Sequence, residues 1–279
     1  MTQRKNKVVL FGARATGRLI HGWVADESDV ICFVDNDRSL WGSIVCGVEV
    51  RGPEHIPALE YDQILICSWS IGTIRQQLLE MGVPREKIDD SHAQYTIRAR
   101  TVWLRDFARQ TYDRGLVGAV AEAGVYLGGY AKEINAAFPD RKLYLFDTFS
   151  GFDARDFPFE EGESWVEGSF SGSSLELVRS VMPHLDQCVF RQGYFPETAE
   201  GVDDSFCFVH LDMDLYRPTL AGLRFFYPRL IAGGVVAVHD FFSSSFPNVK
   251  RAVYDFADSV PGGVRMFPIG DAISIGMIK

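Results

Sequence analysis

Short runs of consecutive apolar residues, each followed by a segment with helical spacing, recur along the whole chain. Such runs are typical of parallel strands that are buried on both faces, because a strand with one wet face alternates instead. The first three runs are KVVLFG (7–12), VICFVDND (30–37) and DQILICSW (62–69). Strands that alternate with helices form a parallel α/β sheet, so the sequence predicts this fold class.

The alternation is interrupted once, between residues 90 and 117, where TIRARTVWLRDFARQTYDRGL predicts one charge-rich amphipathic helix. A chain of 279 residues is long enough for two domains, each with its own core. We therefore expect a small Rossmann-like domain at 1–92, a connecting helix at 93–117 and a second domain at 118–279.

The second domain is predicted to contain seven strands, of which the last two are short and close the chain. Seven strands with such a closing pair fit a doubly wound sheet with an antiparallel edge. The predicted strands are 118–125, 142–149, 188–195, 206–214, 232–241 and the closing runs VRMFPI and AISIGMIK.

Composition excludes several classes of protein. A hydrophobic fraction of 47% is too high for a disordered chain. With 28 basic and 37 acidic residues the net charge is −9, which argues against partners such as nucleic acids or anionic membranes. No stretch approaches the roughly 20 apolar residues of a membrane span. The five cysteines are scattered without a C-x-x-C pair, as in a reducing compartment, so we expect a cytoplasmic protein.

A glycine-rich turn, EAGVYLGG (122–129), is predicted between the first strand and the first helix of the second domain. Glycines let a ligand approach the backbone, and the helix N-terminus offers unpaired N–H groups. Asp147 ends the next strand, 25 residues after Glu122, where an acid can bridge two ribose hydroxyls. A tight turn with a helix cap is the structural alternative, but the combination favours a nucleoside-type cofactor.

Two acidic groups follow later strands, in HLDMDLY and HDF. The carboxyl ends of parallel strands share one edge of a sheet, so Asp212, Asp214 and the pair His239–Asp240 are expected near the glycine turn. Carboxylates with an imidazole can hold a divalent ion or supply a general base. A cap on the next helix is the alternative for Asp214, and His210, between apolar residues, is predicted to be a core histidine.

From about residue 96 to the C-terminus, the order and context of several motifs resemble the TylF/MycF family of S-adenosylmethionine-dependent methyltransferases, the macrocin O-methyltransferase type. The resemblance implies a class I methyltransferase fold, a methyl donor at the glycine turn and a magnesium site at Asp212, Asp214 and Asp240. The motifs are EAGVYLGG, LFDTFSGF, FRQGYFPET, HLDMDLYRPT, FFYPRLIAGGVVAVHDF and VKRAVYDF. The donor-binding residues that it implies are Glu122, Gly124, Tyr126, Gly128, Asp147, Thr148, Phe149 and Asp212.

This chain departs from the family at His239, because members that use magnesium commonly have two acids where it has His239–Asp240. Imidazole is a poor ligand for magnesium and an acceptable one for manganese, iron or zinc. Two hypotheses stay open. A divalent cation, magnesium or manganese, is held by Asp212, Asp214, His239 and Asp240, or His239 takes the acceptor's proton. In either case the predicted catalytic residues are Asp212, Asp214 and His239.

Residues 150–175 lack a clear periodicity and are too many for a simple connection. We interpret them as a lid that excludes water, or as an ordinary ordered loop. The aromatic residues available to stack on a sugar are Phe152, Phe157, Phe159 and Trp165.

The N-terminal domain begins with an altered G-x-G-x-x-G pattern, GARATG (12–17), in which Arg14 replaces the second glycine and obstructs a dinucleotide. Asp35 follows Gly12 by 23 residues. The segment that follows looks like small Rossmann-like domains attached to sugar-modifying transferases. A purely structural domain is favoured, and a contact of Arg14 with the diphosphate of a nucleotide-sugar is the alternative.

The sequence thus predicts an O-methyltransferase that acts on a hydroxyl of a small-molecule sugar or glycosylated metabolite, with a homo-oligomer as a further expectation. The main alternative is a non-catalytic nucleotide-sugar-binding protein with a degenerate methyltransferase domain. Arg14 argues against an NAD-dependent oxidoreductase, and the lack of a G-x-S-x-G elbow argues against a hydrolase.

Overall fold

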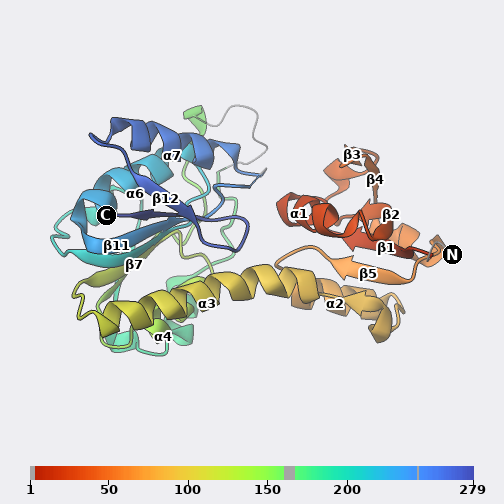
Figure 1. Cartoon of the computed structure of the whole chain (residues 1–279), viewed down its shortest axis with the longest axis horizontal. Coiled ribbons are helices and arrows are strands. Elements are labelled where there is room, and N and C mark those ends of the chain that lie inside the picture. The colour runs from red at the N-terminus through yellow and green to blue at the C-terminus, as the bar shows by residue number, and fades with distance from the viewer. Residues whose placement is uncertain (1–3, 160–166, 244) are drawn as a thin grey trace. The chain divides into compact units, whose positions relative to one another are not determined.

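The computed structural model describes residues 4–159, 167–243 and 245–279 (Figure 1). The chain forms two compact units, Met1–Ala99 and Arg100–Lys279, and each contains one sheet. Among the described residues, no helix combines the length and the apolar character that a membrane crossing requires.

The first unit has a sheet of six strands in the order β3-β4-β2-β1-β5-β6. All neighbouring strands run parallel except β3 and β4, which pair antiparallel. The strands are β1 (Asn6–Phe11), β2 (Ser28–Val34), β3 (Ile44–Val45), β4 (Val48–Arg51), β5 (Gln63–Ile66) and β6 (Ile88–Asp89), and the helices of this unit are α1 (Ala15–Val24) and α2 (Ile71–Glu80). The three predicted strands are present as β1, β2 and β5. The other three, β3, β4 and β6, were not predicted, and β3 and β6 have only two residues each, too few to show a period.

The second unit has a sheet of seven strands in the order β12-β13-β11-β10-β7-β8-β9. The pairs among β7 to β11 are parallel, and β13 pairs antiparallel with both β11 and β12. The strands are β7 (Ala119–Ala123), β8 (Leu143–Asp147), β9 (Cys188–Gln192), β10 (Phe206–Leu211), β11 (Leu230–Val238), β12 (Arg265–Pro268) and β13 (Ile275–Ile278). The predicted fold class is confirmed for both sheets, including the antiparallel edge of the second.

Helices cover both faces of the second sheet and bury a separate core on each (Figure 1). One core contains side chains of α6 and α7, such as Phe226 and Val253, and the other contains side chains of α3, α4 and α5, such as Leu104 and Ile134. The helices are α3 (Ser91–Asp113), α4 (Gly129–Ala137), α5 (Leu175–Val181), α6 (Tyr216–Arg229) and α7 (Pro247–Ser259). Helix α3 spans Ser91–Asp113, whereas the sequence predicts the connecting helix at 93–117.

Short 3-10 helices occupy several connections of the chain. They are η1 (Arg38–Leu40), η2 (Pro53–Ala58), η3 (Arg85–Lys87), η4 (Ala154–Phe159), η5 (Leu185–Gln187) and η6 (Glu197–Ala199). Helix η4 lies within the segment that was interpreted as a lid. Trp165, one of the aromatic residues predicted there, falls outside the described residues, as does the side chain of Phe159.

The strand order reverses at β7, which lies between β8 and β10. Open α/β sheets bind ligands beyond the carboxyl ends of their strands at such a switch point. The register aligns Leu211 of β10 with Ala123 of β7 on one side and with Val238 of β11 on the other. The residues that follow these three strands, Gly124, Asp212 and His239, therefore lie side by side at one edge of the sheet.

Candidate active site

The turn after β7 brings the backbone of Gly124 into contact with the end of β10. A Cβ atom on Gly124 would lie 1.8 Å from the carbonyl oxygen of Asp212, and its φ of +83° favours glycine. The backbone N–H of Asp212 donates to the carbonyl of Ala123 at 2.8 Å. Glycine is therefore required at position 124 by the packing of the two strand ends alone.

Asp147, at the end of β8, holds this turn through its backbone. Its Oδ2 accepts from the N–H of Val125 at 2.7 Å and of Tyr126 at 2.8 Å, and its Oδ1 accepts from the N–H of Phe149 at 2.7 Å. An ionised carboxylate offers about four acceptor positions, so about one is left for a ligand. Asp147 fixes the shape of the turn, and a ribose could add about one hydrogen bond rather than a bridged pair.

The other predicted residues around the turn face in different directions. Tyr126 is exposed, and its ring packs edge to face against the ring of Phe170, with 5.5 Å between the two ring centroids. Phe149 is buried in the core, and the hydroxyl of Thr148 donates to the carbonyl of Gly151 at 2.7 Å. Of these three predicted donor-binding residues, only Tyr126 presents its side chain to solvent beside the turn.

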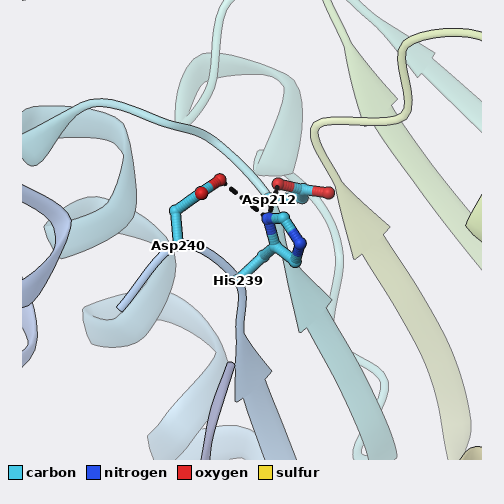
Figure 2. Close-up of side chains that lie close together, drawn as sticks. All are labelled: Asp212, His239 and Asp240. Carbon is cyan, nitrogen blue, oxygen red and sulfur yellow. Dashed lines mark hydrogen bonds and ion pairs between the residues drawn. The ribbon is translucent and has the colours of Figure 1, made fainter. Parts of the chain in front are cut away.

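The acids that follow β10 and β11 meet around one imidazole (Figure 2). Nδ1 of His239 lies 2.9 Å from Oδ1 of Asp212 and 2.7 Å from Oδ2 of Asp240. The side chains of His239 and Asp240 are each 8% exposed, and that of Asp212 is 25% exposed. The structure thus brings three of the predicted acid and histidine residues into direct contact.

The two carboxylates decide the charge of His239. Burial lowers the pKa of this imidazole, but the charges of Asp212 and Asp240 outweigh burial and raise the pKa to about 10. Burial acts to raise the pKa of both carboxyls, yet the charge and hydrogen bonds of His239 hold both below their usual value. At neutral pH the cluster contains an imidazolium between two carboxylates.

Asp214 differs from both neighbouring acids. Burial and the charges of Asp240 and Asp212 raise its pKa well above the usual value, and a hydrogen bond with the side chain of Asp240 acts in the same direction. Helix α6 has Leu215 at its N-cap without a side-chain hydrogen bond, so Asp214 does not act as the cap. Asp214 and Asp240 both have a left-handed backbone, with φ of 61° and 59°, which costs a non-glycine residue on the order of 1 kcal/mol. This strain lies at the edge of the sheet where the candidate site residues gather.

A second group of buried polar side chains lies beneath the turn. Nδ1 of His210 lies 2.9 Å from Oε1 of Glu122, and Nε2 faces Nη1 of Arg100 at 3.4 Å. Because a guanidinium only donates, Nε2 accepts and Nδ1 carries the proton that is donated to Glu122. Burial and then the charge of Arg100 lower the pKa of His210, so this fully buried histidine is neutral, in agreement with its predicted place in the core.

Arg100 and Tyr130 were not predicted as site residues. The guanidinium carbon of Arg100 lies over the ring of Tyr130, 4.1 Å from the ring centroid. Nη1 of Arg100 lies 3.9 Å from Oδ2 of Asp212. Arg100 comes from the middle of α3, where nothing distinguishes it from the other arginines of a charge-rich helix. For Tyr130, the only signal in the sequence is its position directly after Gly128 and Gly129.

Two buried polar atoms at the turn have no hydrogen-bond partner within the described part of the chain. They are Oε2 of Glu122 and the hydroxyl of Tyr130. An unsatisfied buried polar group costs about 1–3 kcal/mol, so such atoms indicate a place for a ligand. The ligand that satisfies both has a group that binds a carboxylate and a group that accepts from a hydroxyl.

The donor set of the cluster does not fit magnesium. Ligand atoms of Asp212, His239 and Asp240 all lie within 4.8 Å of one another. Magnesium demands octahedral oxygen ligands, whereas the atom between the two carboxylates is an imidazole nitrogen. The fourth predicted ligand, Asp214, is hydrogen-bonded to Asp240. A nitrogen-tolerant ion such as manganese would have to displace the proton that both carboxylates hold on His239.

In the first unit, the turn after β1 (12–17) is held by a hydrogen bond and an ion pair with residues of the same unit. Oδ2 of Asp35 accepts from the N–H of Ala13 at 2.8 Å, and Arg14 forms an ion pair with Asp37 at 2.5 Å. A Cβ on Gly17 would lie 1.9 Å from the carbonyl oxygen of Gly12. The pairing of Arg14 competes with the diphosphate contact considered for it.

Comparison with known families identifies the family of the chain. The sequence model of the family described as Macrocin-O-methyltransferase (TylF) matches residues 73–261, well over half of the chain. The chain belongs to the TylF family. Residues 4–89 match a second model, described as C2185-like, N-terminal. The family resemblance predicted from the sequence is therefore confirmed, and membership implies S-adenosylmethionine as methyl donor.

Individual relatives of this TylF family member are methyltransferases. A protein of Streptomyces olivaceus, the 8-demethyl-8-(2,3-dimethoxy-alpha-L-rhamnosyl)-tetracenomycin-C 4'-O-methyltransferase, is 28% identical over 156 residues, 51% of this chain and 59% of that protein. The chain thus covers less than two thirds of this relative. The solved O-methyltransferase NovP is 24% identical with a TM-score of 0.54, over 65% of this chain and 79% of NovP. The calicheamicin methyltransferase CalS11 is 21% identical with a TM-score of 0.55, over 75% of this chain and 91% of CalS11. Both structures share the fold.

Proposed function

We propose that this protein transfers a methyl group from S-adenosylmethionine to a hydroxyl of a sugar on a glycosylated small molecule. One observation carries the proposal. The glycine turn with its two unpartnered buried atoms adjoins the carboxylate–imidazole cluster, at the edge of the sheet where this fold binds ligands. A donor at the turn would present its methyl group to an acceptor at the cluster. The rhamnosyl-compound O-methyltransferase of Streptomyces olivaceus supports a sugar as acceptor.

The methionine end of the donor fits the two unpartnered atoms. Its ammonium group would bind Oε2 of Glu122, and its carboxylate would accept from the hydroxyl of Tyr130. Burial raises the pKa of Glu122 well above its usual value, and an ammonium group would favour the ionised form. The N-terminus of α4, the helix that carries Tyr130, adds a partial positive charge next to the carboxylate of the donor.

The remaining predicted donor-binding residues act mainly through the backbone in this proposal. Gly124 and Gly128 shape the turn, and Asp147 holds it while it offers about one acceptor position to the ribose. Phe149 and Thr148 support the loop after β8 through core packing and a hydrogen bond to Gly151.

Asp214 is the best candidate for the general base. Burial and the charges of Asp240 and Asp212 raise the pKa of Asp214, so of the three acids at this edge it binds a proton most readily. Asp212 and Asp240 are held ionised, and His239 already carries a proton. The positive sulfonium of the donor would favour the ionised form of Asp214.

The reaction then needs little covalent help from the protein. The acceptor oxygen attacks the methyl carbon in line with the sulfur, so that an O–CH₃ bond forms while the S–CH₃ bond breaks. The electron pair of the broken bond stays on sulfur, and the hydroxyl proton moves to Asp214. The imidazolium of His239 stabilises the negative charge that develops on the oxygen.

Aromatic side chains beside the turn provide a surface for the acceptor. Phe170 is exposed, and its ring centroid lies 5.5 Å from that of Tyr126 and 5.2 Å from that of Phe152. The two ends of the proposed lid are joined there, because the N–H of Phe152 donates to Ser169 and the N–H of Gly168 donates to Phe152, each at 3.0 Å. We propose that the described part of this segment around Phe152 and Phe170 lies against the sugar.

A methyl-transfer assay tests the proposal. The full chain is incubated with S-adenosylmethionine and a panel of rhamnosylated and other glycosylated acceptors, and methylated product is measured by mass spectrometry. We expect turnover by the wild type and a loss of kcat of about 10²–10⁴-fold in Asp214→Asn, with donor affinity retained. Asp204→Asn, which removes an acid bound to Lys142 and Tyr144 outside the site, is the control. Stabilisation by nucleotide-sugars, with none by S-adenosylhomocysteine, would instead support the non-catalytic alternative.

A further inference from the structure

Basic side chains of the protein itself contact the acids of the site, and Figure 2 shows one of them, His239, between Asp212 and Asp240. Asp212 lies between two of them, with Nδ1 of His239 at 2.9 Å from Oδ1 and Nη1 of Arg100 at 3.9 Å from Oδ2. Asp240 lies against the same Nδ1 at 2.7 Å. The side chains of His239, Arg100 and Asp240 are each 8% exposed, so water screens these charges little.

The donor set of this cluster contains an imidazole nitrogen, whereas magnesium demands octahedral oxygen ligands. A divalent cation bound to both Asp212 and Asp240 would have to lie where Nδ1 of His239 now contacts the two carboxylates. It would also lie close to the guanidinium of Arg100, whose Nη1 is 3.9 Å from Oδ2 of Asp212.

We propose that this enzyme works without a metal ion, and that the side chain of His239, with Nδ1 2.9 Å from Asp212 and 2.7 Å from Asp240, occupies the place of a divalent cation. The inference rests on the proposed function, because the group that the ring serves is the acceptor oxygen of the methyl transfer. A ring held beside this oxygen by two carboxylates can stabilise the transition state through a fixed N–H group.

The first test uses the wild-type protein as purified, after dialysis against EDTA. We expect the rate of methyl transfer to change less than twofold in EDTA or on addition of magnesium or manganese. We also expect no rise in the melting temperature with millimolar magnesium or manganese. Loss of activity in EDTA, or stabilisation of the wild type by either ion, would overturn the proposal.

The second test restores an all-oxygen donor set with His239→Asp. This variant places three carboxylates at the cluster, so we expect magnesium to raise its melting temperature and calorimetry to show magnesium binding at least tenfold tighter than to the wild type. His239→Asn is the matched control, since it removes the positive charge without adding a third carboxylate, and it should not respond to magnesium. A folded His239→Asp variant that binds magnesium no better than the wild type would contradict the proposal.

The binding measurements need no methyl acceptor. If no acceptor is methylated but magnesium binds only to His239→Asp, the proposed function fails while the inference on the cation site holds. If His239→Asp does not fold, the metal response of the wild type still decides the question.

Discussion

Among single residues, His239 has the charge state that most affects its neighbours. It stays protonated at neutral pH because Asp212 and Asp240 both contact Nδ1, at 2.9 and 2.7 Å. The charge of His239 holds the pKa of Asp212 and of Asp240 below the usual value, although burial acts to raise both. Charge and fold stability are therefore linked at this residue.

The stability of the fold should depend on the protonation of His239 in a defined pH range. Its pKa is about 10 in the folded chain and near the ordinary histidine value of 6.5 when unfolded, so the folded state binds the proton more tightly. The resulting stabilisation is fully present below pH 6.5 and is lost as the pH rises through about 10. We expect the difference in unfolding free energy between wild type and His239→Asn, measured by urea titration, to shrink by a few kcal/mol over this range. If the unfolding free energies of the two proteins changed with pH in parallel, the result would contradict a protonated His239 in the folded state.

The residue types at the strand ends could be predicted from the sequence, whereas their contacts could not. Asp35 and Asp147 occupy the position where a ribose-binding acid is expected, yet each accepts hydrogen bonds from the backbone of its own glycine turn. Arg100 and Tyr130 reach the site from α3 and α4 through tertiary packing, which leaves no local pattern.

At the level of elements, the segment that joins β8 to α5 has two stretches held together by backbone hydrogen bonds and, among its described residues, one exposed ring, that of Phe170. The backbone hydrogen bonds between residues 152 and 168–169 fix its ends, and Phe170 lies beside the turn after β7. The sequence predicted a long connection with aromatic residues here. It did not predict which ring faces the turn, because that depends on the φ of +65° at Phe170 and on packing against Tyr126.

Phe170→Ala should weaken acceptor binding more than donor binding. An aromatic contact contributes about 0.5–1.5 kcal/mol beyond its buried area, so we expect the KM for the acceptor to rise a few-fold to about tenfold. Steady-state kinetics with the acceptor varied, and calorimetry with S-adenosylhomocysteine, separate the two effects. Leu185→Ala, a similarly exposed apolar residue on η5, serves as the control. A variant that loses donor affinity but keeps the acceptor KM would argue against an acceptor surface here.

For the whole molecule, the alternation of apolar runs and helices was enough to predict two α/β sheets and the antiparallel edge of the second. The domain bounds 1–92 and 118–279, with a separate connecting helix, stay a prediction from the sequence. The first unit resembles a dinucleotide-binding domain in outline only. Gly17 is needed for packing, as Gly124 is in the second unit, and Arg14 is paired with Asp37.

Donor binding at the turn after β7 is tested most directly by calorimetry with S-adenosylmethionine on the wild type and on Tyr130→Phe. The hydroxyl that this change removes has no partner in the described part of the chain, so the melting temperature should stay the same or rise. A lost hydrogen bond to a charged group should weaken donor binding about tenfold or more. Tyr144→Phe is the matched control, because its hydroxyl binds Asp204 outside the site. We predict tight binding by the wild type and by Tyr144→Phe, and weaker binding by Tyr130→Phe. A wild type that gives no heat with the donor, or a Tyr130→Phe variant that binds it equally well, would contradict a methyl donor at this turn.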